Sequence, residues 1–251
     1  MESRLRKKNR QGNTPDEKGS PDVFLEMASL LLHDLEGPFA SMKSILRLLN
    51  NNRFNPNKEL HQRLVASTEV ALQRAETILQ DLMASAKAEQ LGLQVEMEKF
   101  NLKTVLDETV LMASSFAAEN DISVVVSGMP DRPIVYADRD LAARVTDNLL
   151  FNAIRHTLGG GTVKLNIVEK SNEILISITD GGNGFGDIDP ELLFTKYHQM
   201  KLRRERKHRG VGLGLYFCRI ATEAFGGKVW AENAPEGGGR FNFTVPAGGE
   251  K

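Results

Sequence analysis

The stretch around which the second half of the chain is organised reads Asn148-Leu149-Leu150-Phe151-Asn152-Ala153-Ile154-Arg155-His156. It closes a helix that we expect from about Asp138, its N-cap, to His156. Asn148 and Asn152 are four residues apart, so their carboxamides share one face of that helix. Two such oxygens can ligate a hard cation such as Mg2+, or hold its waters beside substrate phosphates, and Arg155 adds a cation near them. An isolated pair of asparagines can equally make ordinary capping and surface hydrogen bonds. Other motifs must therefore decide between that role and cation binding.

The segments on either side of this helix alternate between strand and helix patterns. We expect strands near 99–102, 123–127, 134–137, 162–170, 173–179, 228–233 and 240–245, and further helices near 102–119 and 212–225. The pair of strands around the polar turn at Ser171 and Asn172 should form a hairpin. The pattern predicts an α+β domain over residues 93–251.

A glycine-rich motif directly follows the apolar strand that ends near residue 179, and it reads Asp180-Gly181-Gly182-Asn183-Gly184-Phe185-Gly186. An acid at the end of a strand can accept a hydrogen bond from an exocyclic amine. Gly182 and Gly184 would let the backbone approach a flat ring closely. The alternative is a tight turn around Ca2+, but the Asp/Asn spacing and the terminal Glu of an EF-hand loop are absent.

A second glycine motif opens the helix near 212–225, and it reads Gly210-Val211-Gly212-Leu213-Gly214-Leu215. Backbone N–H groups at such a helix start make an anion site. It is not a P-loop, because the Gly-Lys-Ser/Thr ending is missing, and it does not follow a strand as a Rossmann motif does. The basic run 196–209, beginning with Lys196, is either a lid that closes over a triphosphate or a solvated charge run.

The first half of the chain predicts a polar, basic tail over residues 1–20 and a helical hairpin over residues 21–92. An apolar stripe marks its first helix, at Phe24, Ala28, Leu31, Leu35, Phe39, Met42, Leu46 and Leu49. A second stripe marks the helix that follows the turn at 50–57, at Leu60, Leu64, Ser67, Ala71, Ala75, Ile78, Leu82 and Ser85. Two helices cannot bury both stripes, so we expect a four-helix bundle from two chains, or else packing on the second domain.

His33 falls on the opposite side of the first helix from the middle of its stripe, and its imidazole is therefore expected to face water. Asp34 follows it directly, and Pro38 should kink the helix just beyond. Alone, an exposed helical histidine is usually a solvated side chain.

The composition excludes several classes of protein. A net charge of −1 gives no field that would favour nucleic acid or an anionic membrane. The single cysteine, Cys218, excludes an intrachain disulfide and is expected to be a buried structural residue. No run approaches the length of a membrane span, so we expect a cytoplasmic protein or the cytoplasmic part of a longer one.

Taken together, the motifs resemble the N, G1 and G2 boxes of the GHKL ATPase superfamily, in order: Asn-x3-Asn-Ala, Asp-x-Gly-x-Gly, a basic lid and Gly-x-Gly-Leu-Gly-Leu. With His33-Asp34-Leu35 and Pro38 upstream on a hairpin, the chain resembles the core of a bacterial two-component sensor histidine kinase. The resemblance covers about residues 22–246. It implies a dimerisation and histidine-phosphotransfer hairpin followed by a Bergerat-type α/β sandwich that binds ATP and Mg2+.

The resemblance also implies a role for each matching residue. Asn152 would hold Mg2+ and Asn148 would support it, and Asp180 would bind the adenine amine with Gly182 and Gly184 beside the base. His33 would attack the γ-phosphate, with Asp34 orienting the ring and acting as base. The phosphate end of the site would be formed by Arg155, Lys196, Gly210, Gly212, Leu213, Gly214 and Leu215.

Three positions depart from the family pattern. Glu36 stands where a basic residue is usual, and Gln199 replaces an arginine often found in the lid, for which Lys196 or Lys201 could substitute. Gly37 stands where Thr or Asn positions a water that dephosphorylates the partner, which counts against phosphatase activity. No sensor or receiver domain is recognisable, so the input is expected from a sensory partner or from further chain.

The sequence therefore predicts a homodimeric, ATP-dependent protein-histidine kinase that passes phosphate to an aspartate of a response regulator receiver domain. Two alternatives stay open: a non-catalytic phosphotransfer or scaffold protein with a GHKL-like domain, and a GHKL serine kinase that regulates a transcription factor. A purely structural coiled coil would leave the glycine-rich half unexplained.

Overall fold

The computed structural model describes residues 36–37, 39–69, 93–195 and 213–248, together with Leu72, Ala75 and Leu79. The predicted basic tail, the start of the first helix and most of the basic run lie outside the described residues. Within the described part of the chain, no helix combines the length and the apolar character needed to cross a membrane.

The first described unit is a helical hairpin that covers part of the predicted one. Residues 39–50 and 59–69 are helical, and a turn with Asn52 in the left-handed region (φ 51°) joins them. The backbone N–H of Asn55 donates to Nδ1 of His61 at 2.9 Å, and the ring of Phe54 stacks on His61 at 5.5 Å between ring centroids. These contacts fix where the second helix begins.

The predicted apolar stripe of the first helix is largely uncovered in a single chain. Phe39, Leu46 and Leu49 are 62%, 54% and 47% exposed, whereas Ile45 and Leu48 are half-buried. The second helix is buried at Ala75 of the predicted stripe and also at His61 and Thr68, which precede it at intervals of seven residues, while Leu60 of the stripe is exposed. The hairpin thus closes on one face and leaves a second apolar face open.

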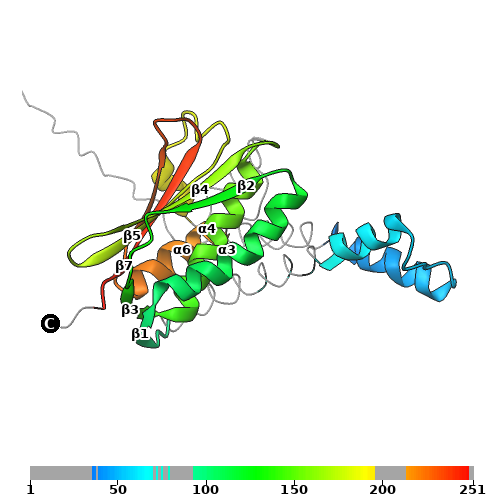
Figure 1. The fold of residues 1–251 in the computed structure, drawn as a ribbon, viewed down its shortest axis with the longest axis horizontal. Coiled ribbons are helices and arrows are strands. Elements are labelled where there is room, and N and C mark those ends of the chain that lie inside the picture. The colour runs from blue at the N-terminus through cyan, green and yellow to red at the C-terminus, as the bar shows by residue number, and fades with distance from the viewer. Residues whose placement is uncertain are drawn as a thin grey trace, which may run out of the picture.

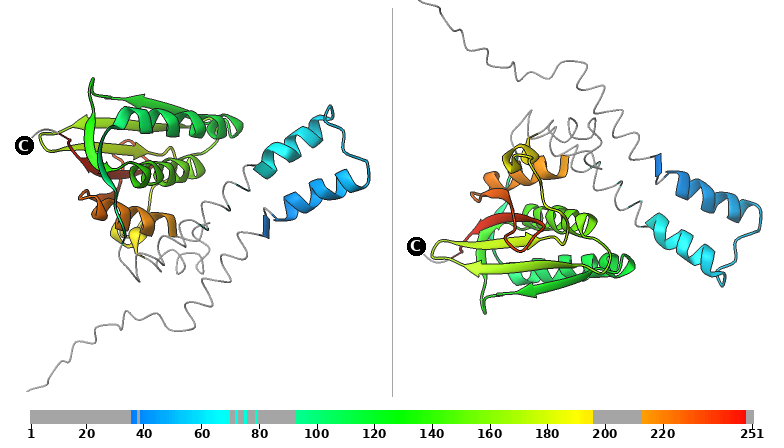
Figure 2. Two further views of the ribbon diagram at one scale, coloured as in Figure 1. Left: turned by 90° about the horizontal axis from the view of Figure 1, so that it is seen from below. Right: turned by 90° about the horizontal axis from the view of Figure 1, so that it is seen from above.

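The second unit is an α+β sandwich, as predicted. Its elements are β1 (Met97–Asn101), α3 (Leu102–Glu119), β2 (Ser123–Ser127), β3 (Ile134–Asp138), α4 (Arg139–His156), β4 (Thr162–Glu169), β5 (Glu173–Thr179), the 3-10 helix η1 (Pro190–Phe194), α6 (Leu213–Ala224), β6 (Val229–Asn233) and β7 (Gly239–Pro246). Helices α3, α4 and α6 cover one face of the larger sheet (Figure 1, Figure 2). The sequence did not predict η1.

The larger sheet has the strand order β2-β4-β5-β7-β6, and every pair is antiparallel except β2 with β4. Side chains alternate between its faces with period two. The face toward the helices is apolar, with Val163, Leu165, Ile167, Ile174, Ile176, Ile178, Phe241, Phe243 and Val245 all buried. A separate small sheet pairs β1 with β3.

Both long helices of this unit begin with a side-chain cap. Asn101 Oδ1 accepts from the backbone N–H of Lys103 at the start of α3. Asp138 Oδ1 accepts from Leu141 at 2.9 Å at the start of α4, as predicted, and its Oδ2 accepts from the backbone N–H of Glu96. Satisfying the free N–H groups of a helix start fixes where α4 begins, and with it the position of the asparagine pair.

Candidate functional site

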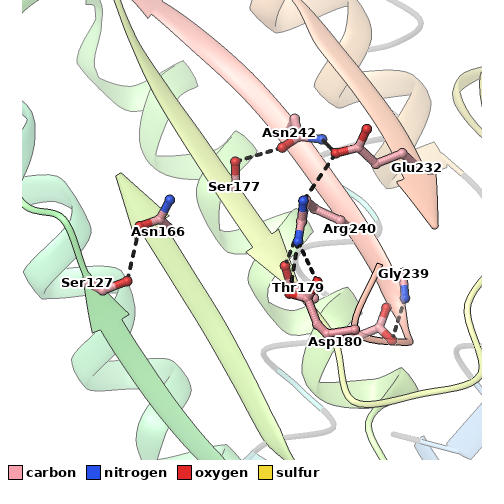
Figure 3. A network of polar contacts seen from close by, with 10 residues as sticks. Ser127, Asn166, Ser177, Thr179, Asp180, Glu232, Gly239, Arg240 and Asn242 are labelled. Carbon is pink, nitrogen blue, oxygen red and sulfur yellow. Dashed lines mark hydrogen bonds and ion pairs between the residues drawn. The ribbon is translucent and has the colours of Figure 1, made fainter. Parts of the chain in front are cut away.

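Asp180 lies at the end of β5 with its side chain almost wholly buried, at 5% exposure. Its Oδ1 accepts from two backbone N–H groups, Gly182 at 2.9 Å and Gly239 at 3.0 Å. Its own backbone N–H donates to the Gly239 carbonyl at 2.9 Å, so the residue is held by β7 as well as by its own loop (Figure 3). Backbone donors stabilise a buried carboxylate and fix its orientation.

The loop after Asp180 needs glycine because the protein's own atoms approach it. A Cβ on Gly182 would collide with the backbone carbonyl of His156 at the end of α4. Gly184 has φ +70°, and a Cβ there would lie 2.5 Å from Asn233 Oδ1. The sequence hypothesis assigned these glycines to room for a ligand ring, whereas packing of the loop against α4 and β6 already requires them.

Two side chains that the sequence analysis missed hold this loop. The Gly181 N–H donates to the Thr157 hydroxyl at 2.9 Å, and that hydroxyl donates to the Ala153 carbonyl. The Phe185 N–H donates to Asn233 Oδ1 at 2.8 Å. Thr157 follows α4 directly, so its position next to the helix end is the one feature of the local sequence that could have indicated its role. Asn233 is 48 residues from its partner, so no local pattern indicates it.

Contacts on either side of α4 show which way the asparagine pair faces. Asp147 and Phe151 contact Thr109 and Phe116 of α3. Toward α6, Cys218 is within 3.9 Å of the Val145 carbonyl, and the long side chain of Arg144 reaches to 4.1 Å from the centroid of the Phe217 ring. Cys218 is buried, as predicted.

Asn148 and Asn152 follow Val145 by three and seven residues, so they fall on the side of α4 that faces α6. Both are half-buried, and Asn148 Nδ2 donates to the Arg144 carbonyl at 3.1 Å. Each carboxamide also carries an oxygen, the donor type that Mg2+ accepts together with waters and phosphate oxygens. In the part of the chain that the structure describes, no group of three or more His, Cys, Asp or Glu could hold a metal ion by itself.

Arg155 is exposed and follows Asn152 by three residues on α4, so it falls on the same side of the helix. It lines a cavity of about 200 Å³ between the ends of α3 and α4, together with Phe116, Asn120 and Thr157. A second cavity, of about 280 Å³, lies against Asp180 and Gly181 and is lined also by Lys164 and Glu236. Neither cavity is lined by Asn148 or Asn152. The structure therefore brings Asp180 together with Gly182 and Gly184.

Several predicted site residues lie outside the described residues: His33, Asp34, Lys196, Gly210 and Gly212. Leu213 begins α6, Gly214 is half-buried in its first turn, and Leu215 is buried in the core. The segment that leads into the basic run is anchored to α6, because Arg219 pairs with Glu191 at 2.6 Å and lies over the ring of Phe194.

A polar network on the outer face of the sheet braces the strands next to Asp180 (Figure 3). Arg240 Nε donates to the Thr179 hydroxyl at 3.1 Å, and its Nη2 pairs with Glu236 at 2.9 Å. The backbone N–H of Glu236, followed by the Arg240 charge, holds the pKa of Glu236 below its ordinary value. Since β5 ends and β7 begins at the site, this network fixes the two strands that carry Asp180 and Gly239.

Comparison with known proteins shows which proteins the chain is similar to. Residues 137–249 match the family described as histidine kinase-, DNA gyrase B-, and HSP90-like ATPase. Over 226 residues the chain is 27% identical to the adaptive-response sensory kinase SasA of Crocosphaera subtropica, which covers 88% of this chain and 59% of SasA. The chain is a homologue of sensor histidine kinases. It is also 28% identical to the sensor histidine kinase WalK of Bacillus subtilis, over 88% of this chain and 36% of WalK.

Solved histidine kinase structures share the fold. The catalytic domain of histidine kinase ThkA superposes with a TM-score of 0.52 at 26% identity, covering 61% of this chain and 97% of that domain. Histidine kinase ThkA in complex with the response regulator protein TrrA gives a TM-score of 0.57 at 23% identity, over 90% of this chain and 62% of that chain. This histidine kinase homologue spans less than two thirds of the length of the two curated relatives named above.

Proposed function

We propose that this chain is an ATP-dependent protein-histidine kinase that phosphorylates His33 and passes the phosphoryl group to an aspartate of a response regulator. The observation that carries the proposal is the buried carboxylate of Asp180, fixed by backbone N–H groups at the end of β5 within the matched ATPase domain.

The environment of Asp180 suits an adenine. Two backbone donors converge on Oδ1, so Oδ2 is the oxygen free to accept a hydrogen bond from an exocyclic amine. Guanine presents a carbonyl oxygen at the equivalent ring position, and two acceptors facing each other repel. The site is therefore expected to prefer ATP over GTP.

The phosphates of ATP would extend from this loop toward α4 and the start of α6. Asn152, supported by Asn148, would hold Mg2+ through its carboxamide oxygen, since both lie on the side of α4 that faces α6. When bound, Mg2+ neutralises charge on the phosphates. The glycines at 210, 212 and 214 would supply backbone N–H groups at the N-terminus of α6, where the helix dipole favours an anion.

Phosphoryl transfer to His33 would be a substitution at phosphorus. A ring nitrogen of His33 bonds to the γ-phosphorus while the bond from that phosphorus to the bridging oxygen breaks, and ADP leaves. Asp34 holds the proton on the other ring nitrogen and so keeps the attacking nitrogen in its basic form. In the second transfer an aspartate oxygen bonds to the phosphorus, and the nitrogen–phosphorus bond breaks.

The open apolar face of the hairpin supports a homodimer. Phe39, Leu46 and Leu49 are exposed on the first helix, and Leu60 is 65% exposed on the second. A second copy of the hairpin would cover both rows in a four-helix bundle. ThkA is known in complex with a response regulator, and we propose a receiver domain of that kind as the phosphoryl acceptor here.

Labelling with ATP that carries a radioactive γ-phosphate tests the proposal. The wild-type protein should become labelled, and His33→Gln should remove the label. Asn152→Ala should abolish Mg-ATP binding in calorimetry. A label that survives in His33→Gln would refute the assignment of the phosphorylated residue, and unchanged affinity in Asn152→Ala would refute the metal role.

The same experiment separates the alternatives. Phosphohistidine is lost in acid, whereas the phosphoserine formed by a GHKL serine kinase is retained. A scaffold protein without catalysis would show no label at all. Gly37 has no side chain to position a hydrolytic water and lies on the described part of the helix, so the protein is not expected to accelerate loss of phosphate from its regulator.

A further inference from the structure

We propose that Asn233, at the end of β6, is a positioning residue for the purine end of the nucleotide site. The inference rests on the proposed function, because it assigns a role to a side chain that touches the Asp180 loop but lies outside the predicted motifs.

The loop that carries Asp180 is held at its far end by one side chain. Asn233 Oδ1 accepts from the backbone N–H of Phe185 at 2.8 Å. The same oxygen occupies the space that Gly184 leaves open, since a Cβ there would lie 2.5 Å from it. Asn233 therefore determines how far the glycine loop can move toward β6.

The residue on the other side of this hydrogen bond anchors the loop in the core. The Phe185 ring is 8% exposed and packs edge-on against Phe241 of β7 at 5.4 Å between ring centroids. Asn233 itself pairs in register with Gly239, whose N–H donates to Asp180 Oδ1. One pair of residues, Asn233 and Gly239, thus fixes both the carboxylate and the loop that follows it.

Because Asn233 is exposed, a role in positioning the loop can be distinguished from a role in folding. The residue as a whole is exposed, so removing its side chain opens no cavity in the core. Water can replace the lost acceptor for the Phe185 N–H without a large cost in stability. What water cannot replace is the fixed distance between the loop and β6, on which the purine-binding geometry depends.

The test is calorimetric titration of the full chain with Mg-ADP, Mg-GDP and inorganic tripolyphosphate, alongside thermal unfolding. Asn233→Ala should weaken ADP binding about tenfold, the equivalent of one hydrogen bond, and reduce the preference for ADP over GDP. Tripolyphosphate affinity should stay within about twofold, and Tm should hardly change. Asn233→Asp keeps an acceptor oxygen and should recover most of the ADP affinity.

Asn166→Ala is the matched control, because Asn166 is an exposed asparagine on β4 that bonds to a side chain, Ser127, away from the loop. It should leave all three affinities unchanged. Unchanged ADP affinity in Asn233→Ala would overturn the positioning role, and so would a parallel loss for ADP and tripolyphosphate. If the wild-type protein binds no ADP, the proposed function fails instead.

Discussion

At the scale of single residues, Asp147, one position before Asn148 on α4, has a carboxyl group whose burial disfavours the charged form. Burial raises the pKa of its carboxyl group above the ordinary value of 3.8, although a hydrogen bond with Thr109 acts in the opposite direction. Its Oδ1 is buried without a hydrogen-bond partner. The folded state therefore holds a proton more tightly than the unfolded chain does, and ionisation at neutral pH costs stability.

Asp147→Asn is accordingly expected to raise the free energy of unfolding at neutral pH by roughly 1 kcal/mol, because the amide carries no charge to desolvate. The gain should shrink as the pH falls through the raised pKa, since the wild-type carboxyl then also becomes neutral, and should vanish below about 3.8. Thermal unfolding at several pH values measures this. Asp107→Asn, an exposed acid on α3, is the control. Equal stability of wild type and Asp147→Asn at neutral pH would contradict the prediction.

At the scale of elements, the sequence predicted most of the second unit because its signals are local. Alternation with period two located β4 and β5, and a capping aspartate located the start of α4. The hydrogen bonds that shape the site were not predictable in this way, since Thr157 and Asn233 meet partners 24 and 48 residues away. The 3-10 helix η1 was missed although its start signals are local, a capping Asp189 followed by Pro190.

The hairpin turn is a second element whose stability depends on one residue that the sequence analysis passed over. His61 is 6% exposed, accepts a hydrogen bond from the Asn55 N–H and stacks on Phe54. His61→Ala should destabilise the turn by about 1–2 kcal/mol through loss of the hydrogen bond and the stacking. Hydrogen exchange at the Asn55 amide should become about tenfold faster or more.

Arg63→Ala is the control for the turn, because Arg63 is 77% exposed and makes only a surface pair with Glu59. Its effect on exchange at Asn55 should be small. If His61→Ala left the Asn55 amide as protected as in the wild type, the turn would not depend on this side chain.

At the scale of the whole molecule, the faces that a single chain leaves open indicate where a second copy would bind in the proposed homodimer. Leu46 and Leu49 are exposed on the hairpin, one turn apart, and a soluble helix seldom leaves such a row uncovered. Leu46→Glu combined with Leu49→Glu would place charges in the seam between two hairpins, where desolvation is costly. We expect this variant to sediment as a monomer while the second unit, which contains none of these residues, keeps its affinity for Mg-ADP.

Leu111→Glu is the control: it changes a residue on α3 that is even more exposed, at 73%, and should leave the dimer intact because α3 belongs to the other unit. A double variant that stays dimeric would place the subunit interface elsewhere on the chain, whereas a monomeric Leu111→Glu would move it to the second unit.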